Sequence, residues 1–154
     1  MWTASVLALV FAVLALLHLY WALGGQWGVD AVVPRVPASA ARGNHLFGSD
    51  EMPPMVRAFN PSQGTTLLVA GVLAGVAVLV VLQAGLLGTA VAQPALRWTL
   101  VSVAVAMLLR AVGDFRLVGF FKKITGSRFA RLDTLVYSPL CMALGLGLSA
   151  VAAA

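Results

Sequence analysis

The sequence predicts an all-α integral membrane protein, a four-transmembrane-helix bundle with a long loop between helices 1 and 2. Of its 154 residues, 61% are hydrophobic and only 10% are charged, whereas a soluble domain has about 25% charged residues. The mean hydropathy is +0.98. Because a soluble core of this size does not need so much apolar surface, we expect a single transmembrane domain over residues 1–154.

Four apolar segments have the length of a membrane-spanning helix, which needs about 20 residues to cross about 30 Å of hydrocarbon. They cover approximately residues 3–25, 65–87, 94–112 and 134–154. None of them alternates apolar and polar residues with a period of two, so helices are expected rather than barrel strands. The short connection between the second and third segments predicts an antiparallel pair.

The connection between the first two segments is about 40 residues long and rich in proline and glycine. Its prolines, Pro34, Pro37, Pro53, Pro54 and Pro61, make a long regular helix improbable there. It also carries scattered apolar residues: Phe47, Met52, Met55, Val56 and Phe59. We therefore expect this loop to fold back over the bundle or the lipid headgroups.

Basic residues are distributed unevenly between the two sides that four spans define. The first and third connections share one side and carry Arg35, Arg42, Arg57, Arg116, Lys122, Lys123, Arg128 and Arg131. Arg110 lies just inside that side, and the other side has only Arg97. The positive-inside rule predicts a multi-pass membrane protein with both of these loops in the cytoplasm and both termini outside. This placement explains the net charge of +5 without nucleic acid, for which no motif is present.

Polar residues gather where three helices end on the predicted cytoplasmic side. Intramembrane ionisable residues are functional candidates by default. The predicted ligand-binding residues are His18, Trp21, Arg110, Asp114, Arg116, Asp133, Tyr137 and Ser138. Among them, His18, Asp114 and Asp133 are candidate catalytic residues, because a histidine oriented by a carboxylate can act as a general acid or base near neutral pH.

Two side-chain arrangements are predicted within this layer. Arg110 and Asp114 are spaced i, i+4, which places them on one helical face, and we expect them to pair and turn into the bundle. His18 is expected to point inward and to hydrogen-bond to a charged side chain of this layer, or to Ser138 or Tyr137, beside a cavity that reaches toward the cytoplasmic loops.

A purely structural interpretation of the layer stays open. Arg110 can extend to the membrane interface, Asp133–Thr134 has the form of a helix N-cap, and the aromatic residues near the end of the first helix suit an interfacial belt. His18 fits none of these roles, although a lone membrane histidine is more often a hydrogen-bonded packing residue than a ligand.

Other features are weaker. Gly71 and Gly75 have G-x-x-x-G spacing, and the stretch "ALGLGLSA" in the fourth helix is similar; both permit close contact inside the bundle or between protomers of a homo-oligomer. Pro139 should kink the fourth helix near its start.

No metal or cofactor is expected, because Cys141 is alone and the C-x-x-C, H-E-x-x-H and phosphate-loop motifs are missing.

Two blocks carry a resemblance to a known family. They are "HLYWALGGQWG" (His18–Gly28) and "GDFRLVGFFKKITGSRFARLDTLVYSPLCMALG" (Gly113–Gly145). They resemble the signature blocks of the bacterial membrane-protein family catalogued as domain of unknown function 3995. The resemblance implies a small bacterial membrane protein and brings no activity with it.

Three functions remain open at this point. The first is binding or carrying a lipid-like or amphipathic small molecule in a polar pocket between helices one, three and four, with the long loop as a lid. The second is a small enzyme acting on a lipid or isoprenoid with His18 as acid or base, which a direct histidine–carboxylate hydrogen bond beside a closed cavity would favour. The third is a structural or regulatory membrane partner whose basic loops contact lipids and whose cytoplasmic end holds no cavity.

Overall fold

The computed structural model describes residues 2–37, 55–58, 60–88, 93–123 and 127–154. The long helices are α1 (Trp2–Ala22), α4 (Gln63–Gln83), α5 (Pro94–Val112) and α7 (Ser138–Ala153). The helix α6 (Arg128–Leu132) and the π-helical turn η1 (Asp133–Tyr137) directly precede α7. The connection after α1 contains the short helix α2 (Val29–Val32) and the strands β1 (Arg35–Pro37) and β2 (Met55–Arg57).

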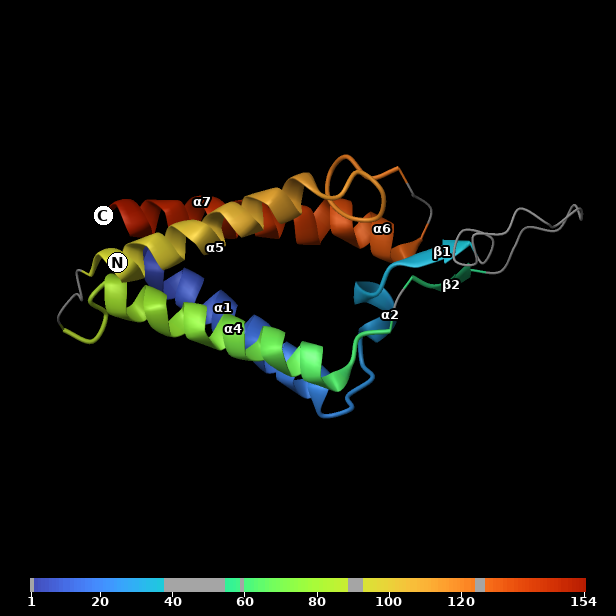
Figure 1. Cartoon of the computed structure of the whole chain (residues 1–154), viewed down its shortest axis with the longest axis horizontal. Coiled ribbons are helices and arrows are strands. Elements are labelled where there is room, and N and C mark those ends of the chain that lie inside the picture. The colour runs from blue at the N-terminus through green and yellow to red at the C-terminus, as the bar shows by residue number, and fades with distance from the viewer. Residues whose placement is uncertain (1, 38–54, 59, 89–92, 124–126) are drawn as a thin grey trace, which may run out of the picture.

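Four helical segments are long and apolar enough to cross a membrane, namely α1, α4, α5 and the continuous run Arg128–Ala153. α1 packs mainly against α4, and α5 packs mainly against α7. Figure 1 shows these two antiparallel pairs lying close together at the end that holds both termini and diverging toward the other end. We term this other end, which carries α2, β1, β2 and α6, the loop end.

The hydrophobic core lies toward the end with the termini. Phe11, Val80, Leu100 and Leu148, one from each long helix, are fully buried in it. The small-residue stretch of α7 is used here as predicted. A Cβ added at Gly145 would collide with Leu108 of α5, and one at Gly147 would crowd Leu7 of α1. Glycine thus allows α7 to approach both neighbours closely.

The other predicted small-residue face is not used inside this chain. Gly71 and Gly75 are exposed, and a Cβ added at either would meet nothing within 4 Å. α4 instead packs through Ala70, Leu73 and Val76, which are buried. Contact between protomers through the glycine face stays a prediction.

The fourth helical segment begins earlier than predicted, at residue 128 rather than 134. Its N-cap is Ser127, whose hydroxyl accepts the Ala130 N–H over 3.0 Å. Asp133 is therefore not a cap but lies inside the helix, where the π-helical turn begins. Pro139 explains the distortion, because its ring has no N–H and would clash with the carbonyl group four residues earlier in a regular helix.

The long connection contains regular structure that the sequence did not predict. β1 and β2 pair antiparallel, with Arg35 opposite Arg57. The Asp30 carboxylate accepts hydrogen bonds from both guanidiniums, at 2.8 Å from Arg35 and 3.3 Å from Arg57. This hydrogen bonding lowers the pKa of Asp30, with Arg35 as the largest cause. The predicted apolar anchors Phe47, Met52 and Phe59 lie outside the described residues.

Candidate functional site

The predicted polar residues lie at the loop end but do not form a single site. α1 and α5 end there, and η1 and α7 begin there, so the topology brings their polar residues to the same end (Figure 1). One group surrounds Asp133, and a second lines a cavity between α1 and α4. Asp114 and Arg116 are exposed and belong to neither group.

The first group, termed the Asp133 network, consists of Arg110, Gly119, Lys122, Asp133 and Thr134. The Asp133 side chain is fully buried. Its Oδ1 accepts Arg110 Nη2 at 2.8 Å, and its Oδ2 accepts the Gly119 N–H at 2.7 Å and Lys122 Nζ at 3.0 Å. Lys122 Nζ also donates to the Gly119 carbonyl and the Thr134 hydroxyl. Both charges of the buried lysine–aspartate pair are thus hydrogen-bonded, which is the condition for burying ions without a large penalty.

The network holds two cations and one carboxylate. The Lys122 side chain is 2% exposed and that of Arg110 is 32% exposed, so Arg110 carries the outer, partly solvated charge. Within the described ranges, Arg110 Nη1 and Ser138 Oγ are buried without a hydrogen-bond partner. No group of three His, Cys, Asp or Glu residues that could hold a metal ion is found in the same ranges. Because the Asp133 oxygens are already occupied, the network is suited to joining η1 to α5 and the turn that follows it.

The predicted pairing of Arg110 with Asp114 is wrong. α5 ends two residues before Asp114, and Gly113 has a φ of 95°, which turns the chain out of the helix. Residues at i and i+4 share a face only while the helix continues. Arg110 pairs instead with Asp133, and Asp114 Oδ1 accepts the backbone N–H groups of residues 116–118 at 2.9, 2.7 and 3.0 Å.

Asp114 organises the turn that follows α5. Burial is the largest single influence and raises its pKa, but the N–H groups of residues 116–118 together outweigh burial, so the pKa is below its usual value. The backbones of Gly113 and Gly119 lie against each other, and a Cβ at either glycine would overlap the backbone around the other. Phe115 has a φ of 59° and is exposed.

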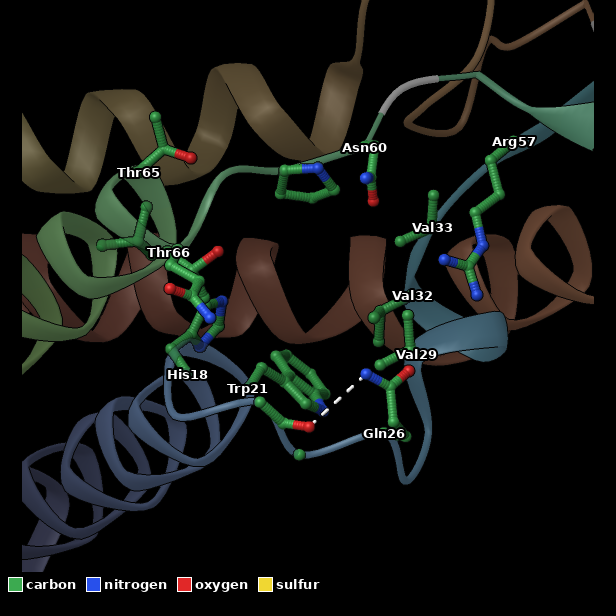
Figure 2. A pocket seen from close by; sticks show the side chains of 15 residues that line it. His18, Trp21, Gln26, Val29, Val32, Val33, Arg57, Asn60, Thr65 and Thr66 are labelled. Carbon is green, nitrogen blue, oxygen red and sulfur yellow. Dashed lines mark hydrogen bonds between the residues drawn. The ribbon is translucent and has the colours of Figure 1, made fainter.

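The second group surrounds a cavity of about 490 Å³, termed the His18 cavity. Its walls come from the end of α1, from α2, from the end of β2 and from the start of α4. The apolar lining residues include Trp21, Val29, Val32 and Val33, and the polar ones include His18, Arg57, Asn60, Thr65 and Thr66. Figure 2 shows His18 and Thr66 at one end of this group and Arg57 at the other, with Asn60 between them. Size and lining match those of small-molecule sites.

His18 lies beside a cavity as expected, but the hydrogen bond predicted for it is wrong. Its Nδ1 lies 2.8 Å from the carbonyl oxygen of Leu14, one turn earlier in α1. Because a carbonyl only accepts, this contact places the hydrogen on Nδ1. Nε2 has no hydrogen-bond partner in the described part of the chain. The ring packs edge to face against Trp21, with 5.1 Å between the ring centroids.

The cavity also differs in place from the predicted pocket between helices one, three and four. It lies between α1 and α4, and none of Arg110, Asp133, Tyr137 and Ser138 lines it. One hydrogen bond connects the elements that carry the two groups: the Tyr137 hydroxyl of η1 donates to the Ala31 carbonyl of α2 at 3.3 Å. A residue of η1 therefore holds the helix that covers the cavity.

Sequence reasoning missed the residues that the connection and α4 contribute to the cavity. One signal was available for Thr65 and Thr66, because Ser62 is a typical N-cap and its hydroxyl accepts the Thr65 N–H at 3.1 Å. That cap places polar residues in the first turn of α4, at the loop end. Nothing in the sequence predicted the positions of Arg57 and Asn60, because the connection around them has no periodic pattern of apolar residues.

The fold and the site indicate the class of protein: a multi-pass membrane protein with four helices long and apolar enough to span a membrane, and with a cavity at one end that polar and apolar residues line together. Over residues 11–148 the chain matches the model of a family described as "Protein of unknown function (DUF3995)". The chain therefore belongs to this family, as its two signature blocks predicted. No curated protein and no solved structure matches it.

Proposed function

We propose that this protein binds a lipid-like or other small amphipathic molecule in the His18 cavity, near the cytoplasmic face of a bacterial inner membrane. The observation that carries this proposal is that a cavity of about 490 Å³ is lined by both apolar and polar side chains. Trp21 and the valines of α2 offer an apolar surface, and His18, Asn60 and Thr66 offer polar groups. Such a lining suits a molecule that has both an apolar and a polar part.

Within this proposal the eight residues expected to bind the ligand take different roles. His18 and Trp21 line the cavity. Asp133 and Arg110 fasten η1 to α5, and Tyr137 holds α2 over the cavity. Ser138, Asp114 and Arg116 have no direct part in binding.

Two alternatives are less well supported. An enzyme with His18 as acid or base calls for a carboxylate on that ring, and the described contact of Nδ1 is the Leu14 carbonyl. A purely structural partner calls for a loop end that holds no cavity. The Asp133 network fits that function, but the His18 cavity beside it does not.

The proposed orientation rests on the basic residues of the loop end, such as Arg57, Lys122 and Arg131, against Arg97 at the other end. A C-terminal reporter that is active only in the cytoplasm should be silent. An active reporter would move the cavity to the outer face of the membrane.

Native mass spectrometry of the protein extracted in a neutral detergent tests the binding proposal. The wild-type protein should retain one small molecule, and Thr66→Phe, which fills the cavity, should lose it. Thr99→Phe is the matched control: the Thr99 hydroxyl, like that of Thr66, donates to the carbonyl group four residues earlier, but Thr99 lies on α5 and does not line the cavity. Absence of any bound molecule, or equal retention in Thr66→Phe, would contradict the proposal.

A further inference from the structure

We infer that the ligand of the His18 cavity carries an anionic group, a carboxylate or a phosphate, and that Arg57 recognises it. This inference rests on the proposed function and adds the charge of the ligand to it. The contacts of Asp30 and Arg57, the polar groups near Arg57 and the apolar residues of the lining all point to the same ligand chemistry.

The charge around the cavity is not balanced. Arg57 is the only charged residue in the described lining. Its partner Asp30 is shared with Arg35, and the Arg35 contact is the shorter one, at 2.8 Å against 3.3 Å. One carboxylate therefore faces two guanidiniums, and Arg57 is the more weakly held of the two. A surplus positive charge at the cavity wall attracts an anion, and a guanidinium binds a carboxylate or phosphate with two parallel hydrogen bonds.

The polar groups near Arg57 are neutral, and the side-chain amide of Asn60 among them is a donor suited to an anion. Figure 2 shows the Asn60 side chain between Arg57 and the first turn of α4, where Thr65 and Thr66 lie. The start of this 21-residue helix adds a partial positive charge on the same side. No acidic side chain in the described lining opposes an anion there.

The apolar part of the ligand has its own surface. Trp21 and the valines Val29, Val32 and Val33 form one wall, and Val69 continues the lining along α4. Val69 is 42% exposed on a helix apolar enough to lie in lipid. An alkyl chain that follows Val69 from Arg57 would therefore run from the loop end toward the hydrocarbon of the membrane.

The test compares probes that differ in charge but share a chain. Palmitate and hexadecanol have the same chain length, and inorganic phosphate is an anion without a chain. Binding is measured by equilibrium dialysis in neutral maltoside micelles and alkaline buffer, where palmitate is ionised. Wild-type protein should bind palmitate more tightly than hexadecanol, and inorganic phosphate should bind weakly or not at all.

Three variants separate the role of Arg57 from that of the other basic residues of the loop end. Arg57→Gln should weaken palmitate binding about tenfold, a change of about 1.4 kcal/mol, and leave hexadecanol binding unchanged. Arg57→Lys should retain part of the affinity because it keeps the charge. Arg116→Gln is the matched control, since Arg116 is an exposed arginine of the loop end that neither pairs with Asp30 nor lines the cavity; it should leave palmitate binding intact.

The outcomes distinguish this inference from the proposed function. Equal affinity for palmitate and hexadecanol, or an equal loss of both in Arg57→Gln, would overturn the anionic ligand and leave an amphipathic one. Binding of neither chain would overturn both proposals. Binding of inorganic phosphate alone, lost in Arg57→Gln, would replace the amphipathic ligand with a free anion and so also overturn both.

Discussion

The Asp133 network and the His18 cavity lie at the same end of the molecule and use similar residues in opposite ways. In the network, a fully buried carboxylate accepts three donors, and the lysine beside it has a partner for each of its hydrogens. Around the cavity, His18 Nε2 has no partner in the described residues, and Arg57 shares one carboxylate with Arg35. Polar groups that satisfy one another fasten helices, whereas polar groups left around a hollow are available to a ligand.

The largest expected effect on stability is at the centre of the network. Asp133→Asn leaves the buried Lys122 ammonium without a counter-charge, so the free energy of unfolding should fall by about 3–5 kcal/mol. Chemical unfolding in mixed micelles measures this change. The same substitution at Asp30, whose side chain is 57% exposed, should have a much smaller effect. Equal losses of stability at the two positions would show that the buried Asp133 network stabilises the fold no more than the exposed ion pairs of Asp30.

A second prediction concerns the cavity wall. Trp21→Ala removes the ring that packs on His18, so palmitate binding should fall about tenfold or more. Stability should fall by less than in Asp133→Asn, because Trp21 is only partly buried. Trp98→Ala serves as the control, since Trp98 is 67% exposed on α5 and does not line the cavity. Unchanged palmitate binding in Trp21→Ala would show that the cavity wall does not contact the ligand.

The link between the two groups gives a smaller effect. Tyr137→Phe removes the 3.3 Å hydrogen bond to the Ala31 carbonyl and should cost about 0.5–1.5 kcal/mol. Hydrogen exchange should quicken in α2, which covers the cavity, and stay unchanged in the core of α4. If the exchange rates of α2 in Tyr137→Phe equal those of the wild type, α2 is held by other contacts.

The smallest effect is expected at Asp114, which belongs to neither group. Its pKa is lowered from 3.8, so its contribution is complete above that pH and is lost as the pH falls through the lowered value. Relative to the intrinsic rate at each pH, amide exchange at residues 116–118 should therefore quicken in strong acid, once the carboxylate is protonated. Asp114→Ala should show the faster exchange at neutral pH as well, and Asp114→Asn, which keeps an acceptor oxygen, should show less of it. A pH-independent wild-type turn would contradict this account.

Most of the architecture could be predicted from the sequence because membrane helices have a length and composition that few other structures share. The topology of four spans then brings His18, Arg110 and Asp133 to one end. The partners within that layer could not be predicted in the same way. Spacing favoured Asp114 for Arg110, but Gly113 ends the helix between them, and the actual partner lies 23 positions away.

The cavity was harder to predict than the network. His18 and Trp21 belong to a helix with a recognisable end, so their place at the loop end follows from the sequence. Arg57 and Asn60 belong to a connection whose course depends on the pairing of β1 with β2. Strands of three residues leave almost no pattern in the sequence, so the residues that they position cannot be located before the structure is known.

The π-helical turn at Asp133–Tyr137 has a consequence for chain length in this family. Five residues close this turn, because the Ser138 N–H reaches back to the Asp133 carbonyl. Deleting one residue from the turn would restore ordinary helical winding, at 3.6 residues per turn, and rotate α6 by about 100° around the axis of α7. Asp133 would then point away from Arg110 and Lys122. In a relative one residue shorter in this turn, a carboxylate at this position would therefore not reach the two cations that hold it here.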